Sequence, residues 1–258
     1  MHYCKTFLSF VFLIVFLNVS LAQADETVVD KKLSLTLGAG GSVLSSEYKG
    51  TDAKVYPIPL IHYENEHLYV RGLTGGVKLY SDGIHELSAT VGYLPQFFRA
   101  KDSDSRAMKR LDNRYSTMMV GGAYRLTTQD YGGAQVSVSA DVLDKNDGFL
   151  VDMSYYYPIT LKRLKLIPEI GGMWTSSDYT DYYYGISSKE SRKSGLKRYK
   201  ANSAFSPYAA FKAQVELNDS WDAFIHTKAV FFDEEITDSP MVNKDVKYSV
   251  GAGLTYSF

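Results

Sequence analysis

The sequence predicts an all-β protein: a transmembrane antiparallel up-and-down β-barrel of about twelve strands, with ten the next count to consider. Two observations predict this fold. Segments that alternate apolar and polar residues recur along the chain, at the length of about 9–11 residues that a tilted membrane strand needs. The final segment alternates in the same way and ends on an aromatic residue, Phe258. A soluble sandwich whose edge strand ends the chain is the alternative.

The closing segment carries the clearest alternation. Its apolar positions are Tyr248, Val250, Ala252, Leu254, Tyr256 and Phe258, and the residues between them are small or polar. This pattern gives a strand one lipid-facing side and one side toward a polar lumen. We expect Tyr256 and Phe258 to form a terminal signal that the barrel-assembly machinery binds.

The N-terminal residues predict a secretory signal peptide at residues 1–24. Lys5 is the one charged residue before Asp25, and the stretch from Phe7 to Val19 is almost wholly apolar. Ala22 and Ala24 supply the small residues of a cleavage site, so the mature barrel is expected to span residues 25–258. A membrane anchor is the alternative, but the apolar run is short for a spanning helix. Cys4, the single cysteine, lies in this segment, so the mature chain is expected to hold no disulfide.

Seven internal segments show the same period of two, at residues 33–39, 87–93, 134–142, 149–157, 164–174, 205–217 and 221–231. In residues 134–142, we expect Val138 to face lipid and Ser137 to face the lumen. Luminal positions on other strands carry Tyr156, Tyr208 and Phe224, whose bulk should fill much of a narrow bore. Adjacent aromatic pairs at strand ends, among them Phe97-Phe98 and Phe231-Phe232, predict the aromatic girdles at the membrane interfaces. A platform for stacking sugar rings is the alternative for these pairs.

Loop lengths predict the topology. If the C-terminus lies in the periplasm, the long segments at 100–113, 176–202 and 233–245 all fall on the outer side, and the short turns all fall on the inner side. Eleven strands are evident, and bacterial barrels prefer even counts. We therefore divide residues 68–81 into two short strands at Gly75-Gly76.

Composition and motifs predict no catalytic, cofactor-binding or metal-binding residues. Removal of Lys5 from the 28 basic residues leaves 27 against 29 acidic ones, and this near balance argues against nucleic-acid binding. Of the histidines, His226 alone falls in mid-strand on the luminal face, where a polar ladder with Asp222 and Lys228 is the simplest interpretation. No serine or carboxylate stands near it at a spacing typical of a nucleophilic site, and paired metal-ligand spacing is absent.

Two outer loops are basic. Their cationic side chains suggest contact with the phosphates of lipopolysaccharide or with a partner, through Arg106, Lys109, Arg110, Arg192, Lys193, Lys197 and Arg198. An ordinary solvated loop surface is the alternative for both.

Several stretches, taken together and in order, resemble the MipA/OmpV family of outer-membrane proteins. They are Glu47-Tyr-Lys-Gly-Thr-Asp52, Pro57-Ile-Pro-Leu60, Asp178-Tyr-Thr-Asp-Tyr-Tyr-Tyr-Gly-Ile-Ser187, Ser194-Gly-Leu-Lys-Arg-Tyr199, Asp238-Ser-Pro-Met-Val242 and Tyr256-Ser-Phe258. Tyr184 departs from the pattern, because the family often has Phe there. The resemblance implies an outer-membrane barrel with no agreed catalytic residues. It also implies partners such as a murein lytic transglycosylase and a penicillin-binding protein.

We therefore expect an outer-membrane protein that is not an enzyme, embedded among outer-membrane lipid and lipopolysaccharide. Its expected role is structural, as a scaffold for murein-remodelling enzymes at the cell envelope. A narrow pore for small solutes is one alternative. A surface adhesin or immunogen that acts through its outer loops is the other.

Overall fold

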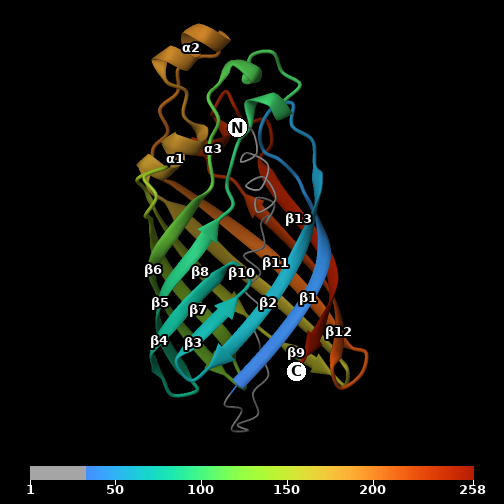
Figure 1. Cartoon of the computed structure of the whole chain (residues 1–258). Coiled ribbons are helices and arrows are strands. Elements are labelled where there is room, and N and C mark those ends of the chain that lie inside the picture. The colour runs from blue at the N-terminus through green and yellow to red at the C-terminus, as the bar shows by residue number, and fades with distance from the viewer. Residues whose placement is uncertain (1–32) are drawn as a thin grey trace, which may run out of the picture.

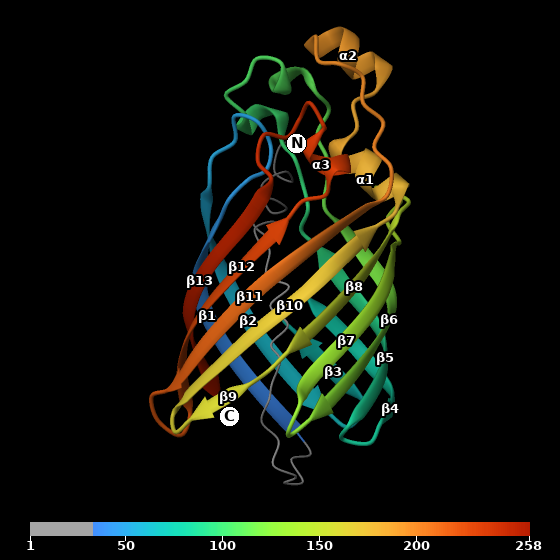
Figure 2. The ribbon, with the colours of Figure 1, turned by 180° about the vertical axis from the view of Figure 1, so that it is seen from behind.

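A computed structural model describes residues 33–258 as one closed antiparallel barrel (Figures 1 and 2). The predicted signal peptide, its cleavage residues Ala22 and Ala24, and the expected new N-terminus at Asp25 lie outside the described residues. The strands are β1 (Leu33–Leu44), β2 (Lys54–Asn65), β3 (Leu68–Arg71), β4 (Thr74–Ser81), β5 (His85–Leu94), β6 (Thr117–Thr128), β7 (Gly132–Asp141), β8 (Phe149–Tyr156), β9 (Ile159–Leu161), β10 (Leu164–Thr175), β11 (Ala204–Glu216), β12 (Trp221–Phe231) and β13 (Val246–Ser257). No helix among these residues is long and apolar enough to cross a membrane.

The barrel closes where the first strand meets the last. β1 pairs with β13 in register from Thr36 opposite Ser257 to Leu44 opposite Ser249. β8 and β9 occupy one position in the wall, because Pro158 interrupts the strand and both segments pair with β10. The wall therefore has twelve strand positions, as predicted.

The short hairpin of β3 and β4 corrects one detail. Gly75 and Gly76 lie inside β4, and the turn falls at Gly72-Leu73, where Gly72 has φ of 63°. Gly72 takes this left-handed conformation without the steric cost that a side chain would bring. Gly76 has a different reason to be glycine: a Cβ there would lie 2.3 Å from the ring of Tyr69 on the neighbouring strand.

The same hairpin is too short to cover its neighbour. β3 pairs with His62, Tyr63 and Glu64 of β2, and the last contact is the Gly72 N–H that donates to the Ile61 carbonyl. On this side, no described strand pairs with residues 54–60 of β2. The wall is thus interrupted between the outer half of β2 and the outer end of β5.

Side chains alternate across the wall as predicted. Val138 faces outward and is 49% exposed, whereas Ser137 lines the lumen. Tyr156 and Tyr208 point inward and are buried, and Phe224 packs against two buried residues of β2. The predicted luminal set is therefore correct at these positions.

All long loops gather at one end of the barrel, and the short turns lie at the other (Figure 1). The long loops hold α1 (Ser177–Tyr184), α2 (Ser188–Ser194), α3 (Glu234–Thr237) and two short 3-10 segments, Ala100–Asp102 and Met108–Arg110. Figure 2 shows the same loop cap from behind. The predicted girdle residues differ in their exposure. Phe231 is exposed, as expected of a girdle, but Phe98 is buried among the long loops. The girdle prediction is therefore wrong for Phe98, because the strand ends before this residue.

Candidate functional site

Bulky side chains from the strands narrow the inner half of the lumen. Ile58 and Leu60 of β2 are buried and pack with Phe224 of β12. Tyr156 and Ile167 form a second small cluster. Lys212 and His226 are also buried on the luminal face. Glycines make room for this bulk, since a Cβ on Gly253 would lie 2.9 Å from the ring of Phe224.

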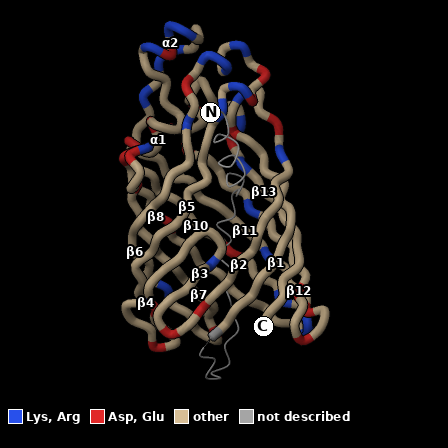
Figure 3. Tube along the Cα trace, in the orientation of Figure 1, with Lys and Arg blue, Asp and Glu red and all other residues tan. Residues whose placement is uncertain are grey.

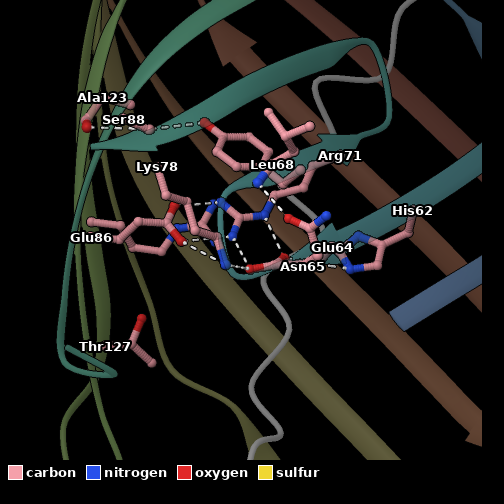
Figure 4. Close-up of polar contacts among 12 residues, drawn as sticks. His62, Glu64, Asn65, Leu68, Arg71, Lys78, Glu86, Ser88, Ala123 and Thr127 are labelled. Carbon is pink, nitrogen blue, oxygen red and sulfur yellow. Dashed lines mark hydrogen bonds and ion pairs between the residues drawn. The ribbon is translucent and has the colours of Figure 1, made fainter. Parts of the chain in front are cut away.

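A charged network crosses the luminal face of four consecutive strands (Figure 4). Arg71 of β3 forms bidentate contacts with Glu64 of β2 and Glu86 of β5, at 2.7–3.0 Å. Lys78 of β4 adds an ion pair with Glu64 at 2.5 Å. Fork-to-carboxylate contacts of this kind fix geometry as well as charge. The network therefore ties the short β3–β4 hairpin to the longer strands on either side.

A second polar cluster lies on the opposite wall. The hydroxyl of Tyr208 on β11 donates to Asp152 of β8 at 3.1 Å and lies 3.3 Å from Glu169 of β10. The ammonium of Lys228 on β12 sits 3.5 Å from the centre of the Tyr208 ring. His226 lies on the same luminal face as Lys228, as predicted, and shares no hydrogen bond with Asp222 or Lys228.

The long loops build a dome over the outer mouth. Tyr48, Phe98, Met108, Tyr183 and Met241 come from four different loops and are at most 3% exposed. The Tyr48 ring lies 4.9 Å from that of Phe98 and 5.8 Å from that of Tyr184. Desolvation by this packing raises the pKa of the Tyr183 hydroxyl well above its usual range. The dome thus has its own apolar core.

Buried polar contacts connect the loops of the dome. Arg114 donates to Glu190 at 2.8 Å and to the carbonyl of Gly185 at 3.0 Å. Burial alone would raise the pKa of Glu190, but the Ser187 N–H and the Arg114 guanidinium hold it below its ordinary value. Ser187 and Glu190 also complete a capping box at the start of α2. The loop at 95–116 is therefore fastened to the loop that carries α1 and α2.

A second buried carboxylate joins the dome to the barrel. Glu47 is 1% exposed and accepts from Gln96 at 2.8 Å, and it pairs with Lys247 of β13 at 3.2 Å. Desolvation opposes its ionisation, but Lys247 and hydrogen bonds keep the pKa of Glu47 below its ordinary value. This contact anchors the loop after β1 to the closing strand.

Between the dome and the narrowed inner half lies a cavity of about 250 Å³. Near the dome its lining is mainly apolar but includes Gln96 and Lys247, and toward the inner half charged or amide side chains line it. Its boundary includes Leu94, Met119 and Ile236 at one end, and Arg125, Gln135, Asp152 and Lys228 at the other. Among the described residues, no group of three or more His, Cys, Asp or Glu is arranged to hold a metal ion.

The basic residues expected to contact lipopolysaccharide or a partner all lie on the dome (Figure 3). Arg106, Lys109, Arg110, Arg192, Lys193, Lys197 and Arg198 are exposed there. The structure brings the two loops together, since Arg110 donates to the Lys193 carbonyl at 3.1 Å. Arg114, at the end of the same loop, is instead buried in the pair with Glu190. At the other end, Phe258 is 70% exposed and its N–H donates to Leu35.

Comparison with known proteins agrees with the resemblance noted in the sequence. The family model described as MltA-interacting protein MipA matches residues 37–258. The chain belongs to the MipA/OmpV family. The MltA-interacting protein of Escherichia coli K12 is 40% identical over 223 residues, which cover 86% of this chain and 90% of that protein.

Two further relatives carry names that give a location. The putative outer membrane protein YiaT of Escherichia coli K12 is 36% identical over 224 residues, covering 87% of this chain and 91% of the relative. The outer membrane protein OmpV of Vibrio cholerae is 30% identical over 160 residues, covering 62% of each. This MipA/OmpV-family protein is therefore an outer-membrane β-barrel, as predicted.

Three features of the lumen and dome were not predicted from the sequence. They are the network around Arg71, the buried Arg114–Glu190 pair and the cavity. Charged residues at alternate positions, such as His62 and Glu64, were a signal for the network. The loops gave no equivalent signal, because their partners are far apart in the chain.

Proposed function

We propose that the protein is a non-enzymatic interaction protein of the outer membrane, which holds a murein-remodelling enzyme at its periplasmic rim. The observation that carries this proposal is the narrowing of the lumen at two levels. Bulky side chains occupy the inner half, and the loops of the dome lie over the outer mouth. A barrel built in this way is better suited to presenting a rigid rim than to passing solutes.

The family supports the choice of partner. A relative that is 40% identical over most of both chains is named for interaction with MltA. By this likeness, we propose a murein lytic transglycosylase as one partner. A penicillin-binding protein is a second candidate, which rests on the family resemblance alone.

The inner turns offer apolar side chains for such a contact. Tyr131 is 75% exposed, Leu161 is 55% exposed and Ile84 is 51% exposed, and each lies in or beside a different short turn. β9, which contains Leu161, extends along β10 without a second neighbour among the described strands. Exposed apolar groups rimmed by polar residues are typical of protein contact surfaces.

Site-specific crosslinking in intact cells tests the proposal. A photoreactive amino acid is placed at Tyr131 or Leu161, with Lys189 on the dome as the matched control. The rim positions should capture a periplasmic murein transglycosylase, identified by mass spectrometry, and the control should not. If neither rim position captures such an enzyme, the scaffold proposal is wrong.

A narrow pore remains the second candidate, because polar and charged side chains line the lumen. With the lumen narrowed in this way, we expect little steady conductance from purified protein in planar bilayers. Large and stable single-channel steps would favour the pore. Adhesion through the dome is the third role, and it requires that protease added to whole cells reach the loop at 189–200.

A further inference from the structure

The cavity between the dome and the inner half has two chemically distinct ends. Leu94, Met119 and Ile236 make one end mainly apolar, although Lys247 also lines it there. Arg125, Lys228 and Asp152 make the other end charged. Ligand pockets in proteins commonly measure about 300–1,000 Å³, so this cavity of about 250 Å³ suits a small molecule. Its two ends match a ligand with an apolar part and a charged part.

The charged end contains cationic and donor groups that the protein leaves incompletely paired. The Nε and Nη2 atoms of Arg125 both donate to Gln135 Oε1, at 3.2 and 2.9 Å. Within residues 33–258, no carboxylate lies at ion-pair distance from Arg125, because its cross-strand neighbour Glu86 is held by Arg71. His226, which also lines the cavity, is 4% exposed and its Nδ1 has no hydrogen-bond partner in the described structure. A partly buried guanidinium without an opposite charge is costly, so Arg125 favours an anionic ligand.

The cavity reaches the β5 side of the interruption in the wall. Thr74, at the tip of the β3–β4 hairpin, and Gly92 and Leu94 of β5 are among its lining residues. β2 lies across the interruption. Because the Ile61 carbonyl points to this side, the backbone groups of Pro59, Pro57 and Val55 do so too.

The two prolines keep this edge of β2 from being sealed. Proline has no N–H, so Pro57 and Pro59 offer carbonyl oxygens but no donors along the open edge. A neighbouring strand could therefore form only part of the usual backbone hydrogen bonds with this edge. Val55 beside them is 73% exposed, and an unpaired backbone facing hydrocarbon would be costly unless water reaches it. Water that reached this point would satisfy the carbonyls.

We infer that the cavity binds a small amphipathic anion, with one acidic head group and a short alkyl chain, that enters sideways from the outer leaflet of the membrane. The head group lies at Arg125 and Gln135, and the chain lies against the apolar end beneath the dome. The interruption beside Pro57 and Pro59 is the route. This site is separate from the periplasmic rim proposed to hold a partner.

Calorimetry on the full barrel in lipid nanodiscs tests the site, with octanoate as the probe and empty nanodiscs subtracted. Octanoate should bind, whereas octylammonium, of opposite charge, and acetate, without the chain, should not. Arg125→Gln should weaken octanoate binding by about tenfold or more, the loss expected for one charge-assisted hydrogen bond. Lys212→Gln is the matched control, since Lys212 is a buried luminal cation outside the cavity. Absence of octanoate binding, or equal affinity in the Arg125 variant, overturns the site.

The route is tested separately with single cysteines, because the chain's one cysteine lies in the predicted signal peptide. Pro59→Cys and Tyr93→Cys flank the interruption, and Val138→Cys lies on the lipid face elsewhere. After reaction with a bulky polar thiol reagent, the two flanking variants should bind octanoate about tenfold more slowly, and the Val138 variant should be unaffected. Unchanged association rates in both flanking variants overturn the lateral route.

Discussion

Replacing Val138 with arginine should destabilise the barrel far more than the same replacement of its neighbour Ser137. Val138 faces outward from β7, between Gly122 of β6 and Val151 of β8. Its side chain is 49% exposed toward the lipid. Ser137 points into the cavity and lies opposite Asp152, which offers the new guanidinium a carboxylate.

The depth of Val138 sets the magnitude. Val138 pairs with Val151 of β8, which is two residues along β8 from Phe149 and four residues from Tyr155. These two aromatic rings mark the outer and inner edges of the lipid-facing band. With a rise of about 3.4 Å per residue and a tilt of about 40°, Val138 is roughly 5 Å below the first ring and 10 Å above the second. An arginine facing lipid costs about 2–4 kcal/mol at the midplane and about 0–1 near the interfaces. Val138→Arg should therefore cost roughly 2 kcal/mol, and Ser137→Arg less than about 1.

A folding titration with urea in lipid vesicles measures both free energies of unfolding. Wild-type protein and Val138→Ala serve as references, because alanine tests the loss of the valine side chain without adding a charge. Equal costs for the two arginine variants, or a larger cost at Ser137, would refute the assignment of faces. Such a result would mean that β7 is shifted by one residue, which exchanges its lipid and luminal sides.

Three further predictions concern the terminus, the dome and the luminal network. Phe258→Asp should reduce the yield of folded barrel in cells, which is measured as heat-modifiable migration on gels. Because Phe258 is exposed, the same variant should refold in detergent almost as well as wild type. Equal yields in cells would contradict a terminal assembly signal. Glu190 has a lowered pKa, so its stabilisation of the dome is complete above the usual glutamate range and disappears as the pH falls through the lowered value. Protease should accordingly cut the loop at 177–203 faster below about pH 4, and Glu190→Gln should be cut rapidly at every pH; a wild-type rate independent of pH would contradict this. Arg71→Met should lower the free energy of unfolding by about 3 kcal/mol, because it leaves Glu64 and Glu86 facing each other, and adding Glu64→Gln should restore part of it; the idea fails if urea titrations show no such rescue.

The sequence alone determined the architecture of the wall. A strand's lipid and luminal faces follow from a period of two, which is a local property, so the placing of Val138, Ser137, Tyr156 and Tyr208 needed no tertiary information. Loop lengths then separated the two ends of the barrel. The family, too, was recognisable from short stretches in their order along the chain.

The tertiary structure alone decided how the barrel is closed and where its wall is interrupted. The dome depends on pairs that are remote in sequence, such as the Tyr48 hydroxyl and the Tyr183 carbonyl, and no local period records such contacts. The turn at Gly72 rather than at Gly75-Gly76 followed from the packing of Tyr69 on Gly76, which is a contact between strands. Likewise, Arg125 is a candidate ligand-binding residue because its neighbour Glu86 forms an ion pair with Arg71 instead. Which charges neutralise each other depends on distances across the lumen, and the order of residues in the chain does not contain those distances.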